Sequence, residues 1–121
     1  MRAFWLLVLA PGFVFAQAAA PTEFPAEAAP LDAEALKTLL TGKTFVMKPV
    51  AGEEVRLQYQ SDFAYINIGR ASDSGKWRID GSSICYEWKR FPAGCSEHRQ
   101  AGTVVYVKRY SNGEVVALQP K

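Results

Sequence analysis

The sequence is poor in the residues that carry metal and nucleophilic chemistry. It contains one histidine, His98, and two cysteines, Cys85 and Cys95. It has no Cys-x-x-Cys pair and no second histidine, which excludes the common zinc motifs. No serine lies in a nucleophile-elbow pattern, and no glycine-rich run has phosphate-loop spacing. We therefore expect a protein that is not an enzyme, with no catalytic residues, no metal and no cofactor, and we place His98 on the surface of a polar strand.

The sequence also lacks an excess of charge of either sign. The whole chain has 14 Lys and Arg against 12 Asp and Glu, a net charge of +2. Nucleic-acid-binding domains carry a clustered basic surface, which this balance does not provide. The paired Lys108 and Arg109 beside Tyr106 and Tyr110 are better explained as a solubilising strand edge. The composition therefore excludes nucleic acid as the expected partner.

Long hydrophobic runs are absent apart from one at the N-terminus. Arg2 precedes an apolar stretch over residues 3–16, and small residues follow at A-x-A spacing, as in Ala18-Ala19-Ala20. This order is typical of a secretory signal peptide, which we assign to residues 1–18. The alternative is an uncleaved anchor, but the run is shorter than the roughly 20 residues that a spanning helix needs. We expect a periplasmic or secreted protein with no membrane span after cleavage.

An exported chain with an even cysteine pair predicts a disulfide between Cys85 and Cys95. The alternative is two free thiols in a reducing compartment. Residues 19–30 are rich in alanine and proline and predict a flexible tether. The remaining residues, 31–121, form the single predicted domain.

A short helix is predicted at the start of this domain. Asp32 stands at the N-cap position, and Leu36, Leu39 and Leu40 form one apolar stripe at helical spacing. Gly42 follows where a left-handed residue would end the helix. We interpret the stripe as a plug on a sheet or barrel; the alternative is a partner-binding face.

From residue 43 onward the periodicity changes to two. About eight short strands are separated by turn signals, of which Asp80-Gly81 and Asn112-Gly113 are the strongest. Residues 69–75 predict a polar loop. The fold class is mainly β, an antiparallel meander that forms a small barrel or a curled sheet. We expect the strands at residues 44–48, 54–60, 64–68, 76–79, 84–89, 95–100, 103–110 and 114–118.

The hairpin over residues 76–89 carries the candidate binding residues. Alternation places Trp77, Tyr86 and Trp88 on one face and Cys85 on the other, among charged residues. The three aromatic side chains either fill a core or line a ligand cavity.

The same hairpin carries a resemblance. Residues 75–81 (GKWRIDG), 84–88 (ICYEW) and Cys95 resemble a group of small bacterial exported proteins of unknown function with the pattern G-x-W-x-x-x-G…C-x-x-W…C. Residues 40–45 (LTGKTF) are similar to the opening of that group. The resemblance implies a periplasmic or secreted β-domain without catalytic residues. Residues 40–45 also resemble the start of lipocalin-like barrels. Those barrels have a Gly-x-Trp sequence near the first strand, and Phe45 takes the place of the tryptophan in this chain.

Two functions follow from these observations. The first is an exported, non-enzymatic binding or interaction module of the bacterial envelope, whose partner is a small apolar ligand or an envelope protein. The second is a periplasmic inhibitor or envelope-stress protein that presents the loops at 69–75 and 91–94 to a protein target. A cavity lined by the aromatic residues favours the first, and a filled core with a protruding loop favours the second.

Overall fold

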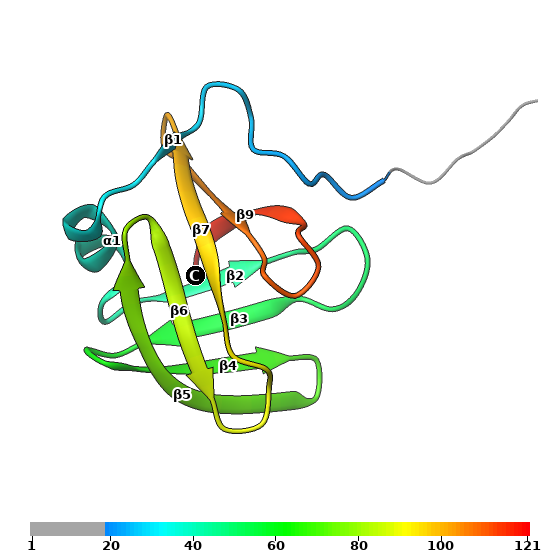
Figure 1. Ribbon diagram of the computed structural model, residues 1–121. Coiled ribbons are helices and arrows are strands. Elements are labelled where there is room, and N and C mark those ends of the chain that lie inside the picture. Colours follow the sequence, from blue (N-terminus) through cyan, green and yellow to red (C-terminus); the bar gives the residue numbers. More distant parts are fainter. Residues whose placement is uncertain (1–18) are drawn as a thin grey trace, which may run out of the picture.

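The computed structural model describes residues 19–121, so the predicted signal peptide lies outside the described residues. Within this range the chain forms one helix and nine strands (Figure 1). None of the helical structure in residues 19–121 is long and apolar enough to cross a membrane. The elements are β1 (Ala29–Pro30), α1 (Ala33–Leu40), β2 (Thr44–Met47), β3 (Val55–Tyr59), β4 (Phe63–Ile68), β5 (Ala71–Asp80), β6 (Ser83–Trp88), β7 (Gly94–Ala101), β8 (Val104–Lys108) and β9 (Val115–Pro120).

Strands β2 to β9 form a closed antiparallel barrel. Each strand pairs with the next one along the chain, and β9 returns to pair with β2, where Phe45 lies opposite Pro120. Closure satisfies the backbone groups that an open sheet would leave at its edges. The predicted fold class, a mainly β meander of eight strands with one short helix and one disulfide, is confirmed.

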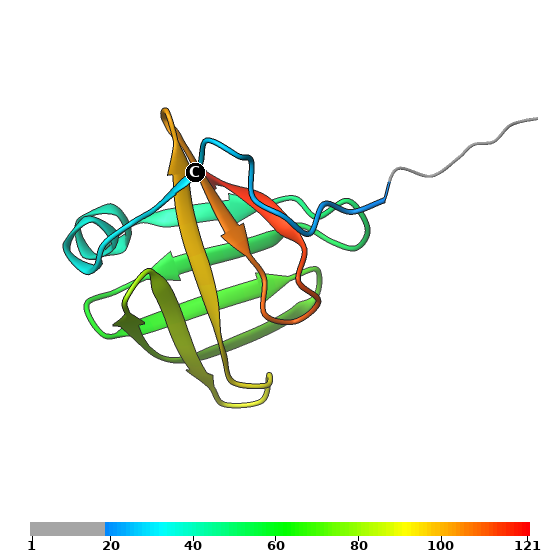
Figure 2. The same ribbon diagram turned by 45° about the horizontal axis from the view of Figure 1, so that its top comes forward.

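Helix α1 lies at one end of the barrel, beside the β5–β6 turn (Figures 1 and 2). The Asp32 carboxylate accepts a hydrogen bond from the Ala35 N–H at 2.8 Å, as expected of an N-cap. Leu36 and Leu40 have no exposed surface and join the hydrophobic core. Gly42 has a φ of 78°, the left-handed conformation predicted at the end of the helix. The apolar stripe of α1 therefore packs onto the barrel.

The core at this end of the barrel is aromatic. The Tyr59 ring packs edge-on against Trp77, with 5.1 Å between ring centroids, and edge-on against Phe45 at 6.1 Å. The hydroxyl groups of Tyr59 and Tyr86 share a hydrogen bond of 2.6 Å, and burial raises the pKa of both phenols. The core beside α1 is thus filled by large side chains.

The predicted hairpin at residues 76–89 has the expected register. Trp77 pairs with Tyr86 and Arg78 with Cys85, so the aromatic and cysteine side chains lie on opposite faces. Cys85 lies directly opposite Cys95 across β6 and β7, and the two form a disulfide. Both the pairing of the cysteines and their separation from the aromatic face are confirmed.

Two segments differ from the expectations. Residues 71–75 were predicted as loop but belong to β5, and only Gly69 and Arg70 make the turn. They extend the strand because their backbone pairs with β4 along its whole length. On the other side of β5, Gly75 permits close pairing with β6, since a Cβ there would collide with the backbone of Glu87.

The segment before α1 also differs from the tether that its composition predicts. Ala29 and Pro30 form β1 and pair with Gln100 and Arg99 of β7. Strand β6 pairs only with residues 94–97 of β7, so β1 occupies the part of that edge which β6 leaves uncovered. The Val115 N–H donates to the Pro21 carbonyl at 2.8 Å. This segment crosses the outside of the barrel beside β7 and β9 (Figure 2).

Candidate functional site

A cavity of about 560 Å³ lies inside the barrel, at the end away from α1. It is bounded by the inner faces of six strands, by the β6–β7 loop and by the β8–β9 loop. Its exposed lining residues are Pro92, Ala93, Tyr110 and Ser111, so it reaches the molecular surface between the β6–β7 and β8–β9 loops. The lining residues are Met47, Val55, Leu57, Ile66, Ile68, Tyr86, Trp88, Phe91, Pro92, Ala93, Ser96, His98, Val107, Arg109, Tyr110 and Ser111.

The two sides of this cavity differ in polarity. Strands β2, β3 and β4 contribute only aliphatic side chains and the thioether of Met47. Apart from Tyr86 and Trp88 on β6, the lining residues with polar groups come from β7 and from the chain that follows β8, namely Ser96, His98, Arg109, Tyr110 and Ser111. Strands β3 and β7 are four positions apart in a barrel of eight strands, so they face each other across the lumen. An apolar wall therefore faces a polar wall.

Two of the three predicted aromatic residues line this cavity. Tyr86 and Trp88 stack with their ring centroids 4.8 Å apart and their planes at 10°. Trp77 is not among the lining residues. It packs in the core beside α1, and its indole N–H donates to the Gln60 carbonyl at 3.0 Å. The alternation of the hairpin places all three side chains on the inner face of the barrel. It does not show that Trp77 lies at the end near α1 and that Trp88 lies at the cavity end.

Tyr110 was not predicted as a site residue, yet it organises the entrance to the cavity. Its hydroxyl accepts a hydrogen bond from the Trp88 indole N–H at 3.1 Å and donates to the Pro92 carbonyl at 2.6 Å. Burial raises the pKa of this phenol, so it stays protonated and able to donate. Its ring also fills the space where Gly94 lacks a Cβ. Tyr110 thereby connects the β8–β9 loop to the β6–β7 loop.

Asp73 fixes the other side of the β6–β7 loop. Its carboxylate accepts hydrogen bonds from the backbone N–H groups of Ser74, Arg90 and Phe91, at 2.7 to 2.9 Å. Desolvation acts to raise the pKa of Asp73, but these N–H groups and the charge of Arg90 outweigh it and lower the pKa to about 2. The carboxylate is thus ionised at neutral pH. The β6–β7 loop is held against the barrel, with Phe91 packed on the core.

His98 is not the surface residue that the polar sequence around it predicts. It is 1% exposed and points into the barrel, because Ser96 and His98 take the inward positions of β7 while Glu97 and Arg99 face outward. Its Nδ1 lies 2.9 Å from the Ser96 carbonyl oxygen and donates to it. Burial lowers the pKa of His98 to about 4, so the ring is neutral at pH 7. Its Nε2 is left as an acceptor on the cavity wall.

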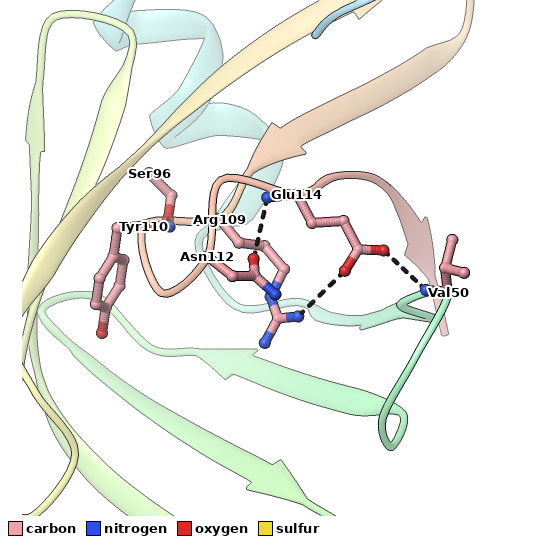
Figure 3. A network of polar contacts seen from close by, with 6 residues as sticks. All are labelled: Val50, Ser96, Arg109, Tyr110, Asn112 and Glu114. Carbon is pink, nitrogen blue, oxygen red and sulfur yellow. Dashed lines mark hydrogen bonds and ion pairs between the residues drawn. The ribbon is translucent and has the colours of Figure 1, made fainter. Parts of the chain in front are cut away.

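A buried pair of opposite charges lies at the β8–β9 hairpin (Figure 3). The Arg109 Nη1 atom is 3.9 Å from Glu114 Oε1, and Glu114 Oε2 accepts a hydrogen bond from the Val50 N–H at 2.7 Å. The Glu114 N–H in turn donates to Asn112 Oδ1 at 3.0 Å. Glu114 is 3% exposed and Arg109 lines the cavity. Glu114 thus connects the β2–β3 loop to the β8–β9 hairpin.

These groups do not form a nucleophile with its base. The Ser96 Oγ atom accepts from the Tyr110 N–H at 3.2 Å, and among residues 19–121 no serine hydroxyl bonds to a ring nitrogen of His98. Over the same residues no three His, Cys, Asp or Glu side chains gather as metal ligands do. The arrangement suits the binding of a molecule that is apolar on one side.

The comparisons with known proteins identify a family and no further relative. Neither a curated protein nor a solved structure matches the chain. The spaced G-x-W and C-x-x-W pattern and the likeness to lipocalin-like barrels therefore stay predictions. A family model described as "protein of unknown function (DUF995)" matches residues 6–118. This match covers nearly the whole chain, including all of the barrel up to Leu118, and the chain belongs to that family.

Proposed function

We propose that this chain is an exported, non-enzymatic binding protein that holds one small apolar molecule inside its barrel. The main support for the proposal is the cavity of about 560 Å³, which the apolar side chains of β2, β3 and β4 line on one side. An eight-stranded barrel is just wide enough either to be filled by side chains or to hold one small ligand. Here the aromatic core fills the end beside α1 and leaves the other end unfilled. Ligand pockets in proteins have volumes of roughly 300–1,000 Å³.

The packing of protein interiors supports this reading. Native cores contain few voids larger than a water molecule, because unfilled space forfeits dispersion contacts. An apolar ligand in this cavity would contact Leu57, Ile66 and Val107 on its wall and so regain dispersion contacts that water does not provide. The aromatic faces of Tyr86 and Trp88 add a flat surface on which an apolar ligand would pack.

The inhibitor alternative has less support. It needs loops that project toward a protein target, whereas most of residues 69–75 are part of β5. The loop at 91–94 is tied to Asp73 and Tyr110 and lies over the cavity. The signal-peptide pattern and the disulfide support export for either function, since disulfides persist in oxidising compartments.

Titration with a neutral fluorescent probe, N-phenyl-1-naphthylamine, tests the proposal on the purified protein. We expect saturable binding with one site per chain, quenching of Trp88 and displacement by dodecanol. The variant Val107→Phe fills the cavity and should weaken binding at least tenfold. Val104→Phe on the same strand is the matched control, because Val104 is exposed on the outside, and its affinity should equal that of the wild type.

Two results would refute this function. One is the absence of saturable binding by a wild-type protein whose circular dichroism shows a folded barrel. The other is equal loss of binding in the Val107 and Val104 variants, which would place the probe on the outer surface.

A further inference from the structure

We infer that the ligand of this cavity carries an anionic head group, which the guanidinium of Arg109 binds at the entrance. This inference rests on the proposed function and adds the chemical class of the ligand. It follows from the hydrogen-bonding state of the polar wall.

The Arg109 guanidinium has hydrogen-bond donors that no protein group accepts among residues 19–121. It presents five N–H groups in a planar fork, and its side chain is only 17% exposed. Its sole charged neighbour among the described residues is Glu114, at 3.9 Å, beyond the 2.7–2.9 Å of a charge-assisted hydrogen bond. No hydrogen bond joins this guanidinium to any group in residues 19–121. None of its nitrogen atoms is fully buried without a partner, so the unpaired N–H groups are accessible and can donate to the oxygen atoms of another molecule.

The Glu114 carboxylate binds the backbone of the β2–β3 loop. Its Oε2 atom accepts from the Val50 N–H at 2.7 Å, so the carboxylate anchors the β2–β3 loop and does not form a two-point pair with Arg109 (Figure 3). It still compensates part of the arginine charge, since opposite charges 3.9 Å apart attract strongly where water is scarce. Glu114 therefore offsets part of the arginine charge while leaving the guanidinium N–H groups available.

Ser96 supplies a second donor on the same wall of the cavity as Arg109. Glu97 pairs with Lys108, so the next inward positions on β7 and on the chain after β8 are Ser96 and Arg109. The Ser96 Oγ atom accepts from the Tyr110 N–H, which leaves its hydroxyl hydrogen able to donate. The planar fork of Arg109 matches the oxygens of a carboxylate or of a phosphate monoester, and the Ser96 hydroxyl is a further donor on the same wall. Deeper on the same wall, the Nε2 atom of His98 is an acceptor and suits a ligand hydroxyl or a water molecule.

The opposite wall sets the rest of the ligand. Met47, Leu57 and Ile66 offer no polar group, so the body of the molecule is an alkyl chain or a flat hydrocarbon. The structure thus matches an amphiphile whose anionic end lies at the β8–β9 hairpin and whose apolar part lies against β2, β3 and β4.

Ligands with one tail and different head groups test the inference. Dodecanoate, dodecyl phosphate, dodecanol and dodecyltrimethylammonium, each below its micelle concentration, compete with N-phenyl-1-naphthylamine at pH 7.5. We expect at least one of the two anions to bind tenfold or more tightly than dodecanol, and the cation to bind most weakly. Comparison of the two anions shows whether the site prefers a carboxylate or a phosphate.

Two variants of the charge pair should act in opposite directions. Arg109→Gln should abolish the preference for the anion and leave dodecanol binding within about twofold. Glu114→Gln keeps an acceptor for the Val50 N–H but removes a competing negative charge, so it should strengthen anion binding at least threefold. Lys108→Gln is the control, because Lys108 carries the same charge one residue away on the outer face, and it should leave the preference unchanged.

The possible outcomes separate this inference from the proposed function. Dodecanol that binds as tightly as both anions, or a preference that survives Arg109→Gln, overturns the anionic head group but not the apolar cavity. The absence of binding by all four ligands and by the probe overturns the proposed function. If Arg109→Gln does not fold, Arg109→Lys replaces it in the test, because lysine keeps the positive charge but lacks the planar arrangement of N–H donors. A reduced preference in that variant then supports the inference, and an unchanged one opposes it.

Discussion

The burial of His98 makes the stability of this barrel depend on pH in a defined window. The pKa of its imidazole is 6.5 in an unfolded chain and about 4 in the folded protein, where desolvation disfavours the charged ring. Between these two values the unfolded chain binds a proton that the folded protein does not. The contribution of His98 to stability is therefore complete above pH 6.5, and it is lost as the pH falls from 6.5 through 4.

The size of the effect follows from the two pKa values. Each pH unit between them is worth about 1.4 kcal/mol for one group. Acidification from pH 7 to pH 4 should thus lower the free energy of unfolding by ~3 kcal/mol through His98 alone. The contribution of Asp73, whose pKa is lowered to about 2, is lost only at more acidic pH. The two groups therefore act in separate windows.

The variant His98→Asn isolates this contribution. Its side-chain amide can still donate to the Ser96 carbonyl, as the imidazole Nδ1 does, but it does not titrate. Urea unfolding followed by circular dichroism at pH 7, 5.5 and 4 gives the free energy of unfolding of both proteins. From pH 7 to pH 4 the free energy of unfolding of the wild type should fall by ~3 kcal/mol more than that of the variant. A constant difference at all three values would show that His98 titrates normally and does not lie inside the barrel.

Two further predictions concern the scaffold. The double variant Cys85→Ala, Cys95→Ala should lose somewhat under ~3 kcal/mol in urea unfolding, because the disulfide closes a loop of ten residues in the unfolded chain; a loss no larger than that of an exposed substitution such as Val104→Ala would contradict this. Leu40→Ala should cost ~2–5 kcal/mol, since Leu40 is a residue of α1 that has no exposed surface and joins the core; a change below ~1 kcal/mol would show that α1 does not pack on the barrel.

Local sequence signals were sufficient for the helix, the hairpins and the disulfide. Asp32 and Gly42 mark the ends of α1 through side-chain and backbone chemistry that depends on a few neighbouring residues. The register of the 76–89 hairpin follows from its turn and from the alternation of its side chains. Once that register is known, Cys85 and Cys95 need only one further strand pairing to meet.

The inward polar residues could not be found by the same reasoning. The alternation rule assumes that one face of each strand is apolar, whereas β7 places Ser96 and His98 inward. Asp73 and Glu114 are also buried polar residues. The sequence predicts Asp73 in a polar loop and Glu114 at the first position of a strand, and neither assignment indicates burial. Their burial depends on partners far away in the sequence, such as the Arg90 and Val50 backbones. A polar strand without an apolar face is the one signal that could have indicated a cavity wall.

The inward polar residues also explain how a barrel of this size keeps a cavity. If the end away from α1 were held together by apolar side chains, those side chains would fill the lumen, as they do around Tyr59. Hydrogen bonds to backbone atoms fix the rim instead. Asp73 holds the β6–β7 loop, Tyr110 holds the same loop at Pro92, and Glu114 holds the β2–β3 loop. Each of these contacts fixes a loop while placing little volume in the lumen. The same chemistry leaves the Arg109 guanidinium at the entrance without a close acceptor, so the device that keeps the cavity open also gives it an electrostatic preference.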